Sequence, residues 1–138
     1  MSTTELPEIS GEHAQTLLEE LPAWGKLTTI ILHAGSVFEF KGEFPAGSLG
    51  EGFYNLRDEG QGFTGHIGVS KVSHITFQEG NHRGRMSYAL VFRRENDEIV
   101  FKVFLGRDAS GEVFAHQLNR YQQLKTRWPI YPAEKEQS

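Results

Sequence analysis

A single histidine stands among small residues in the segment "GFTGHIGVS", residues 62–70. If the segment is a β-strand, its side chains alternate between two faces, and Thr64, His66 and Gly68 share the less apolar one. The imidazole is then either an ordinary half-exposed strand residue or a metal ligand on a platform that a flat molecule can approach. One imidazole is enough to bind a porphyrin iron, because the ring nitrogens supply the other ligands.

A second metal chemistry would need more ligands. The chain has six histidines and no cysteine. His66 and His74 lie eight residues apart on neighbouring predicted strands, and a hairpin between those strands would place both on one face. Such a pair is a hypothetical zinc or non-haem iron site, although no carboxylate is placed to complete the ligand set.

Other side chains could support a ligand bound at His66. Tyr54 in "GFYNLR" could ligate ferric iron or donate a hydrogen bond, or it could be a packed tyrosine with a wet tip. Arg57 ends the same segment, and Arg83 and Arg85 lie in "NHRGR". Guanidinium groups hold carboxylates such as propionates in a bidentate manner, but these arginines could equally belong to a solvated surface.

Several classes of function are disfavoured. The sequence lacks the nucleophile elbow, the P-loop, the H-E-x-x-H helix and a dinucleotide-binding glycine motif after a strand. A net charge of −4 argues against a dedicated nucleic-acid binder. No signal peptide is visible and no run approaches about 18 apolar residues, so we expect no membrane insertion. The absence of disulfides fits a cytoplasmic location.

The elements that must position these residues are read from periodicity. A helix is predicted over residues 11–21, with Ser10 as its N-cap and Pro22 after it. Segments with the composition or alternation of short strands follow at residues 26–33, 36–44, 52–57, 62–70, 72–78, 86–94 and 98–106. Residues 43–52 and the basic stretch 79–86 are predicted loops, and Asn96 and Asp97 form a hairpin turn.

A second helix is predicted over residues 111–127, with Asp108 as a plausible N-cap. Its apolar face would carry Phe114, Leu118, Tyr121, Leu124 and Trp128. The predicted fold class is α+β, a large antiparallel β-sheet flanked by N- and C-terminal helices. We expect a flexible N-terminus over residues 1–9, one domain over residues 10–128, and a flexible tail over residues 129–138.

Five segments taken together resemble a known family. "GKLTTIILH", "VFEFKGEFPAG", "GFYNLR", "GFTGHIGVSKVSHITF" and "FKVFLGRD" occur in this order between about Trp24 and Leu124. They resemble the HutX/ChuX/HuvX family of cytosolic haem-utilization carriers. No single motif is specific, whereas five ordered segments at suitable spacings are hard to obtain by chance.

The resemblance implies a homodimeric haem-binding protein that resembles half of the longer HemS-type haem-trafficking proteins. It carries haem binding over to the histidine of the "GHI" segment, His66. Two departures concern the other ligands. Relatives often carry a histidine at the place of Leu32, one residue before His33, and their aromatic pair reads Tyr-Phe where this chain has Phe53-Tyr54. A shift of one residue in a strand turns a side chain to the other face.

The expected function is that of a cytoplasmic haem carrier that hands its cargo to a partner, such as a haem-degrading enzyme or a haem transporter. His66 is the expected iron ligand. The supporting candidates are Tyr54, His33, His74, Arg57, Arg83 and Arg85. Two alternatives stay open: a haem-degrading enzyme that opens the tetrapyrrole, and a dimeric structural module without haem. Aromatic residues at both Phe38 and Phe40 indicate sheet core or a subunit interface.

Overall fold

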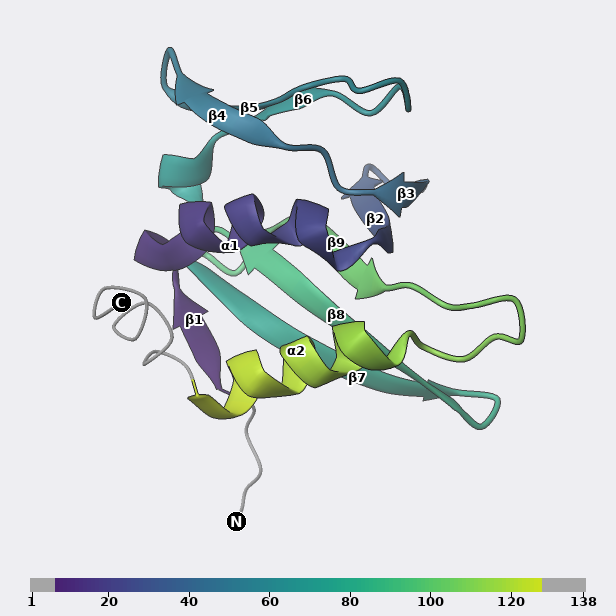
Figure 1. Ribbon diagram of the computed structural model, residues 1–138. Coiled ribbons are helices and arrows are strands. Elements are labelled where there is room, and N and C mark those ends of the chain that lie inside the picture. Colours follow the sequence, from purple (N-terminus) through teal and green to yellow (C-terminus); the bar gives the residue numbers. More distant parts are fainter. Residues whose placement is uncertain (1–6, 128–138) are drawn as a thin grey trace.

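The computed structural model describes residues 7–127, which form two antiparallel sheets and two α-helices (Figure 1). The larger sheet has the order β1-β7-β8-β9-β2-β3 and the smaller one β4-β5-β6. The strands are β1 Glu8–Ser10, β2 Lys26–His33, β3 Ser36–Glu43, β4 Gly47–Gly50, β5 Phe53–Leu56, β6 Gly65–Ile67, β7 His74–His82, β8 Arg85–Arg93 and β9 Ile99–Leu105. The helices are α1 Ala14–Glu20 and α2 Ala115–Arg127. The predicted α+β class is confirmed.

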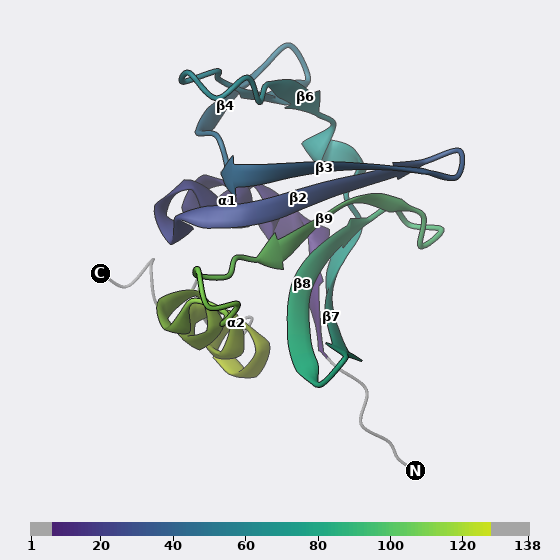
Figure 2. The ribbon, with the colours of Figure 1, turned by 90° about the vertical axis from the view of Figure 1, so that its right-hand side faces the viewer.

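One face of the six-stranded sheet carries the core. The strand register aligns Phe77, Leu90, Val103, Thr29 and Phe40 in one row across five strands. Tyr121 of α2 packs edge-on against Phe77 in this row, with ring centroids 5.3 Å apart. The three-stranded sheet stands at the other end of the molecule from the β7–β8 turn, as Figures 1 and 2 both show. The helices and the small sheet therefore cover a continuous apolar surface.

The N-terminal helical region agrees with the sequence. The Ser10 side chain accepts a hydrogen bond from the Glu12 N–H at 3.3 Å, so the predicted N-cap is confirmed. Helix α1 lies between two 3₁₀ turns, Gly11–His13 and Leu21–Trp24. Pro22 sits inside the second turn, where a proline near the first position loses no hydrogen bond.

Helix α2 begins four residues later than predicted. Gly111 has a φ of 90°, which is incompatible with a helix. Asp108 does not cap α2, because its side chain accepts the N–H groups of Ser110 and Glu112 and closes a separate turn. Tyr121 and Leu124 are buried as predicted, while Trp128 and the tail 129–138 lie outside the described residues.

Four predictions about loops, strands and the N-terminus are wrong. Residues 47–50 form β4 rather than a loop, and the basic stretch contributes the ends of β7 and β8, with Arg83 and Gly84 as the turn. The segment 62–70 is a strand only over Gly65–Ile67, and residues 69–71 form a 3₁₀ turn. Glu8 and Ile9 belong to β1, and Ile9 is buried, so the flexible N-terminus does not reach residue 9.

Pairing overrides local propensity at each of these places. The backbone groups of β4 form hydrogen bonds with β5, and those of residues 79–82 with β8, although glycine, asparagine and histidine are weak strand formers.

No helix within residues 7–127 is long and apolar enough to cross a membrane.

Candidate functional site

The three-stranded sheet sorts its side chains between two faces. On β5, Tyr54 and Leu56 are buried in the core, whereas Phe53 is exposed. The register pairs Asn55 with Ser48 of β4 and with His66 of β6. Because directly opposed residues of an antiparallel pair share a face, Ser48, Asn55 and His66 form one row. We call the face that carries this row the outer face.

The imidazole of His66 is held in one orientation. Its Nδ1 lies 2.7 Å from Oδ1 of Asn55, and Nδ2 of Asn55 donates to the Gly50 carbonyl at 3.1 Å. The second bond fixes the amide, so its oxygen faces the ring and Nδ1 of His66 must be the donor. The lone pair of Nε2 is then available on an exposed side chain, which is the tautomer that a metal needs.

The surroundings of His66 are small and aromatic. The Phe53 ring lies edge-on to the imidazole with centroids 5.9 Å apart, and Phe53 is 44% exposed. Ser48 and Gly50 lie on the neighbouring strand β4, and no bulky residue occupies these positions. The imidazole is therefore exposed on a shallow surface, with an aromatic ring beside it for a flat ligand to contact.

An apolar cavity of about 210 Å³ lies between the two sheets, along the edge of β6. We call it the inter-sheet cavity. Its lining is Thr29, Ile31, Phe44, Leu56, Phe63, Thr64, Gly65, His66, Ile67, Gly68, Val100 and Phe101. A second cavity of about 260 Å³ shares Thr29, Ile31, Phe63 and Thr64 with the first. Pockets for whole drug-sized ligands measure about 300–1,000 Å³, so the inter-sheet cavity could take the edge of a large ring.

Thr29 leaves an unsatisfied polar atom at this cavity. Thr29 is 5% exposed, and its Oγ1 has no hydrogen-bond partner within residues 7–127. A buried hydroxyl without a partner is costly, and such groups in native proteins call for an explanation. A ligand in the inter-sheet cavity, which Thr29 lines, could supply the missing partner.

Tyr54 lies on the strand next to His66, but its side chain points to the opposite face of the sheet. It is 1% exposed, and its register partner is Ile67, so it lies on the core side of the sheet. Burial, together with the carboxylate of Glu19, raises the pKa of the Tyr54 phenol above its usual value. A phenol that resists deprotonation on the opposite face is poorly placed to share an iron with His66.

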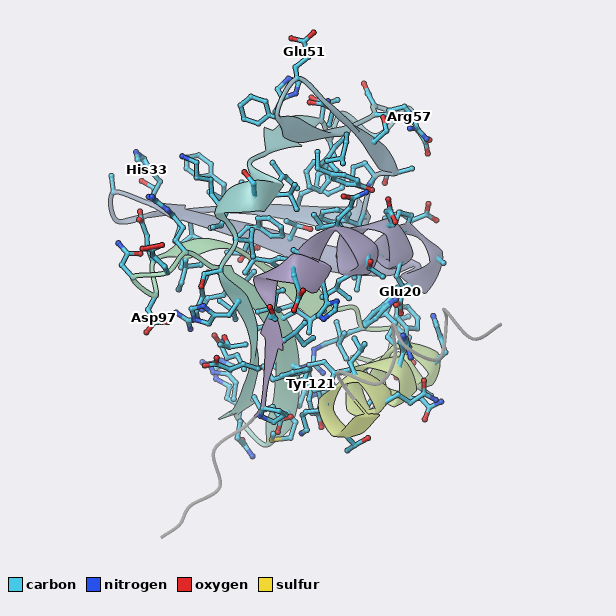
Figure 3. The ribbon with its side chains drawn as sticks, turned by 90° about the vertical axis from the view of Figure 1, so that its left-hand side faces the viewer. Glu20, His33, Glu51, Arg57, Asp97 and Tyr121 are labelled. Atoms are coloured by element: carbon cyan, nitrogen blue, oxygen red, sulfur yellow. The ribbon has the colours of Figure 1, made fainter. Side chains whose placement is uncertain are left out.

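The two other predicted histidines lie apart from His66. The hairpin that would join His66 and His74 does not form, because β6 pairs with β5 whereas β7 pairs with β1 and β8. His74 instead contacts Asp97 at 2.7 Å. The hypothesis of a metal site formed by His66 and His74 is therefore wrong. The described residues contain no group of three or more metal-ligating side chains. His33 is exposed at the tip of the β2–β3 hairpin (Figure 3).

The arginines are divided between two ends of the molecule. Arg57 lies beside the three-stranded sheet, exposed and 4.0 Å from Glu59 (Figure 3). Arg83 and Arg85 belong to the β7–β8 turn, which Figures 1 and 2 place at the opposite end. Of the three, only Arg57 lies at the same end of the molecule as His66.

Sequence reasoning missed three residues of this site. Asn55 orients the imidazole, Phe53 flanks it, and Thr29 lines the inter-sheet cavity. The asparagine could have been suspected, since a polar residue between Tyr54 and Leu56 must face away from the core. Thr29 carried no signal, because threonine is ordinary in a strand.

These features define a two-sheet α+β protein with a solvent-facing, oriented imidazole and an apolar cavity beside it. The family model described as haem utilisation ChuX/HutX matches residues 8–124. The chain therefore belongs to the ChuX/HutX haem utilisation family, as the resemblance predicted. It is 38% identical over 117 residues to the intracellular heme transport protein HutX of Vibrio cholerae serotype O1, covering 85% of this chain and 61% of that protein. The chain thus spans about three fifths of that relative.

Two solved structures support the assignment. A protein from Erwinia carotovora has a TM-score of 0.83 at 30% identity, over 91% of this chain and 78% of its own. The heme binding protein ChuX has a TM-score of 0.78 at 29% identity, over 86% of this chain and 74% of its own. Both likenesses extend over most of this chain.

Proposed function

We propose that this protein binds haem through Nε2 of His66 and carries it reversibly to a partner. The observation that carries the proposal is the bond from Nδ1 of His66 to Asn55, which in the neutral imidazole leaves the lone pair on Nε2 of an exposed side chain. Membership of the haem utilisation family and similarity to a heme transport protein support the same ligand.

The chain's own residues fit such a cargo. His66 offers one neutral nitrogen, Phe53 offers an exposed ring beside it, and the inter-sheet cavity offers apolar walls for the methyl and vinyl groups of a porphyrin edge. Arg57 can contact a propionate, since its nearest carboxylate within residues 7–127, that of Glu59, is 4.0 Å away and both groups are exposed. A single ligand on an open face favours release as well as binding.

The test is haem titration followed by the Soret band. Wild type should give a saturable shift, and His66→Ala should lose it or weaken binding by at least about tenfold, the equivalent of about 1.4 kcal/mol. Tyr54→Phe is the matched control, because the phenol faces the core and its removal should leave the spectrum unchanged. A Soret shift equal in wild type and His66→Ala would contradict the proposal.

The same complex separates carrier from enzyme. Incubated with a reductant under air, a carrier should keep its Soret band and transfer haem to an acceptor such as apomyoglobin. Loss of the band with release of iron or an opened tetrapyrrole would contradict the carrier and support the haem-degrading alternative.

We further propose that the protein is a homodimer. Four apolar side chains of the β2–β3 hairpin are exposed: Ile31, Leu32, Val37 and Phe38. We call them the hairpin patch. Strand β3 is also an edge of the six-stranded sheet, with unpaired backbone groups along one side. Ile31 and Phe38 lie on the face of the hairpin that also borders the cavities, and Leu32 and Val37 lie on the other face. Exposed apolar side chains on both faces of an edge hairpin are typical of a subunit interface.

A further inference from the structure

Two arginines that the haem proposal does not use meet near the β7–β8 turn. Arg85 comes from "NHRGR" and begins β8, and Arg107 comes from "FLGRD" and follows β9. The segment between β9 and α2 brings them together. They line a hollow of about 210 Å³ with Gly84, Met86, Tyr88, Gly111, Glu112, Val113 and Leu118.

Both guanidinium groups are held by the same carbonyl oxygen. Nη1 of Arg85 donates to the Gly111 carbonyl at 2.7 Å, and Nη1 of Arg107 donates to the same oxygen at 2.9 Å. Nη2 of Arg107 also donates to the Met86 carbonyl at 2.6 Å. A side chain at residue 111 would prevent this, because its Cβ would lie 2.1 Å from Nη1 of Arg85. Glycine is thus required for the two positive groups to meet.

The pair has no acidic counterpart. Within residues 7–127, Arg94 pairs with Glu98 and Arg120 with Glu20, but no carboxylate oxygen lies within 4.0 Å of Arg85 or Arg107. Glu112 lines the same hollow without forming such a pair. The two positive charges repel each other, because both guanidinium groups bind the same carbonyl oxygen. Each guanidinium has five N–H donors, so some donors of each group have no carbonyl acceptor in the hollow.

We propose that the hollow between Arg85 and Arg107 binds an oxyanion, a carboxylate or phosphate group of a ligand. Such a group would neutralise both charges and accept the remaining N–H donors in the bidentate geometry that guanidinium favours. The site is separate from the haem proposal, because the β7–β8 turn and the three-stranded sheet lie at opposite ends of the molecule (Figures 1 and 2).

The test is titration of the ¹⁵N-labelled protein with sodium phosphate and, separately, sodium acetate at constant pH and ionic strength. The amide signals of Gly111, Glu112 and Val113 should shift saturably. Binding of both anions indicates a site for carboxylates, whereas binding of phosphate alone indicates a phosphorylated ligand. Either result supports the oxyanion site, and no saturable shift with either anion overturns it.

Three variants locate the effect. Arg85→Gln and Arg107→Gln should each weaken binding by about tenfold, as expected for the loss of one charged hydrogen-bonding partner. Arg94→Gln is the control, since that arginine is paired with Glu98 and should leave the affinity unchanged. If Arg107→Gln fails to fold, Arg85→Gln still decides the matter, because Arg85 is exposed. Equal affinity in Arg85→Gln and wild type would overturn the site.

Discussion

At the scale of single residues, the usefulness of His66 to a metal depends on its neighbour. An imidazole free to rotate presents either nitrogen, and in the neutral form one of them carries a proton. The Asn55 amide, itself fixed by Gly50, assigns that proton to Nδ1. Sequence could nominate His66 because an isolated imidazole among small residues stands out. The alternation along β5 could show only that Asn55 faces away from the core. Its place beside His66 depends on the register between β5 and β6, which is set when the sheet forms.

Asn55→Leu removes the acceptor while leaving His66 in place. We expect haem affinity to fall about tenfold or more, because partners that orient a ligating histidine typically contribute that much. The measurement is haem titration by absorbance, with Ser48→Ala as control, since Ser48 lies in the same row and its loss removes no contact to the imidazole. Unchanged affinity in Asn55→Leu would mean that the orientation of the ring has no part in binding.

At the scale of elements, Gln117 joins the C-terminal helix to the sheet. Its side chain is fully buried, accepts the Gly106 N–H at 2.7 Å, and donates to the carbonyls of Trp24 at 2.9 Å and Lys26 at 2.7 Å. Trp24 ends the 3₁₀ turn before β2, Lys26 begins β2, and Gly106 follows β9. One amide thus satisfies backbone groups that flank two strands of the sheet.

Gln117→Ala should lower the free energy of unfolding by about 3 kcal/mol, because it leaves buried backbone groups unpaired. Urea unfolding is the measurement, with the slope of the transition compared to confirm a two-state process. Gln122→Ala is the matched control on the same helix, because the Gln122 side chain forms no hydrogen bond within residues 7–127. A loss equal to that of the control would show that α2 is held by its apolar face alone.

The elements differ in how far sequence could predict them. Strands β2 and β3 were found almost to the residue, because β-branched and alternating residues flank the Ala34–Gly35 turn. Strand β4 was missed, because "GSLG" has no strand propensity and is held only by β5. The inter-sheet cavity could not be foreseen, since it depends on how one sheet stands over the other.

At the scale of the whole molecule, the hairpin patch is the surface that we expect a second copy of the chain to cover. Phe38 is 60% exposed and Val37 is 56% exposed, on a strand whose outer edge is unpaired. Toward the other end of β3 the exposed residues are charged: Glu39, Lys41 and Glu43. Apolar side chains thus gather at the hairpin tip and charged ones near the base, which favours docking at the tip.

Phe38→Glu should therefore shift the protein from dimer to monomer in sedimentation velocity, because a charge buried at an interface loses its hydration. Leu49→Glu is the control, since Leu49 is 56% exposed on β4, outside the hairpin patch, and its replacement should leave the sedimentation coefficient unchanged. If Phe38→Glu sediments as wild type does, the hairpin patch is not the interface. If only wild type and Leu49→Glu dimerise, the two edge hairpins bring two His66 sites into one assembly, and haem stoichiometry per dimer becomes the next measurement.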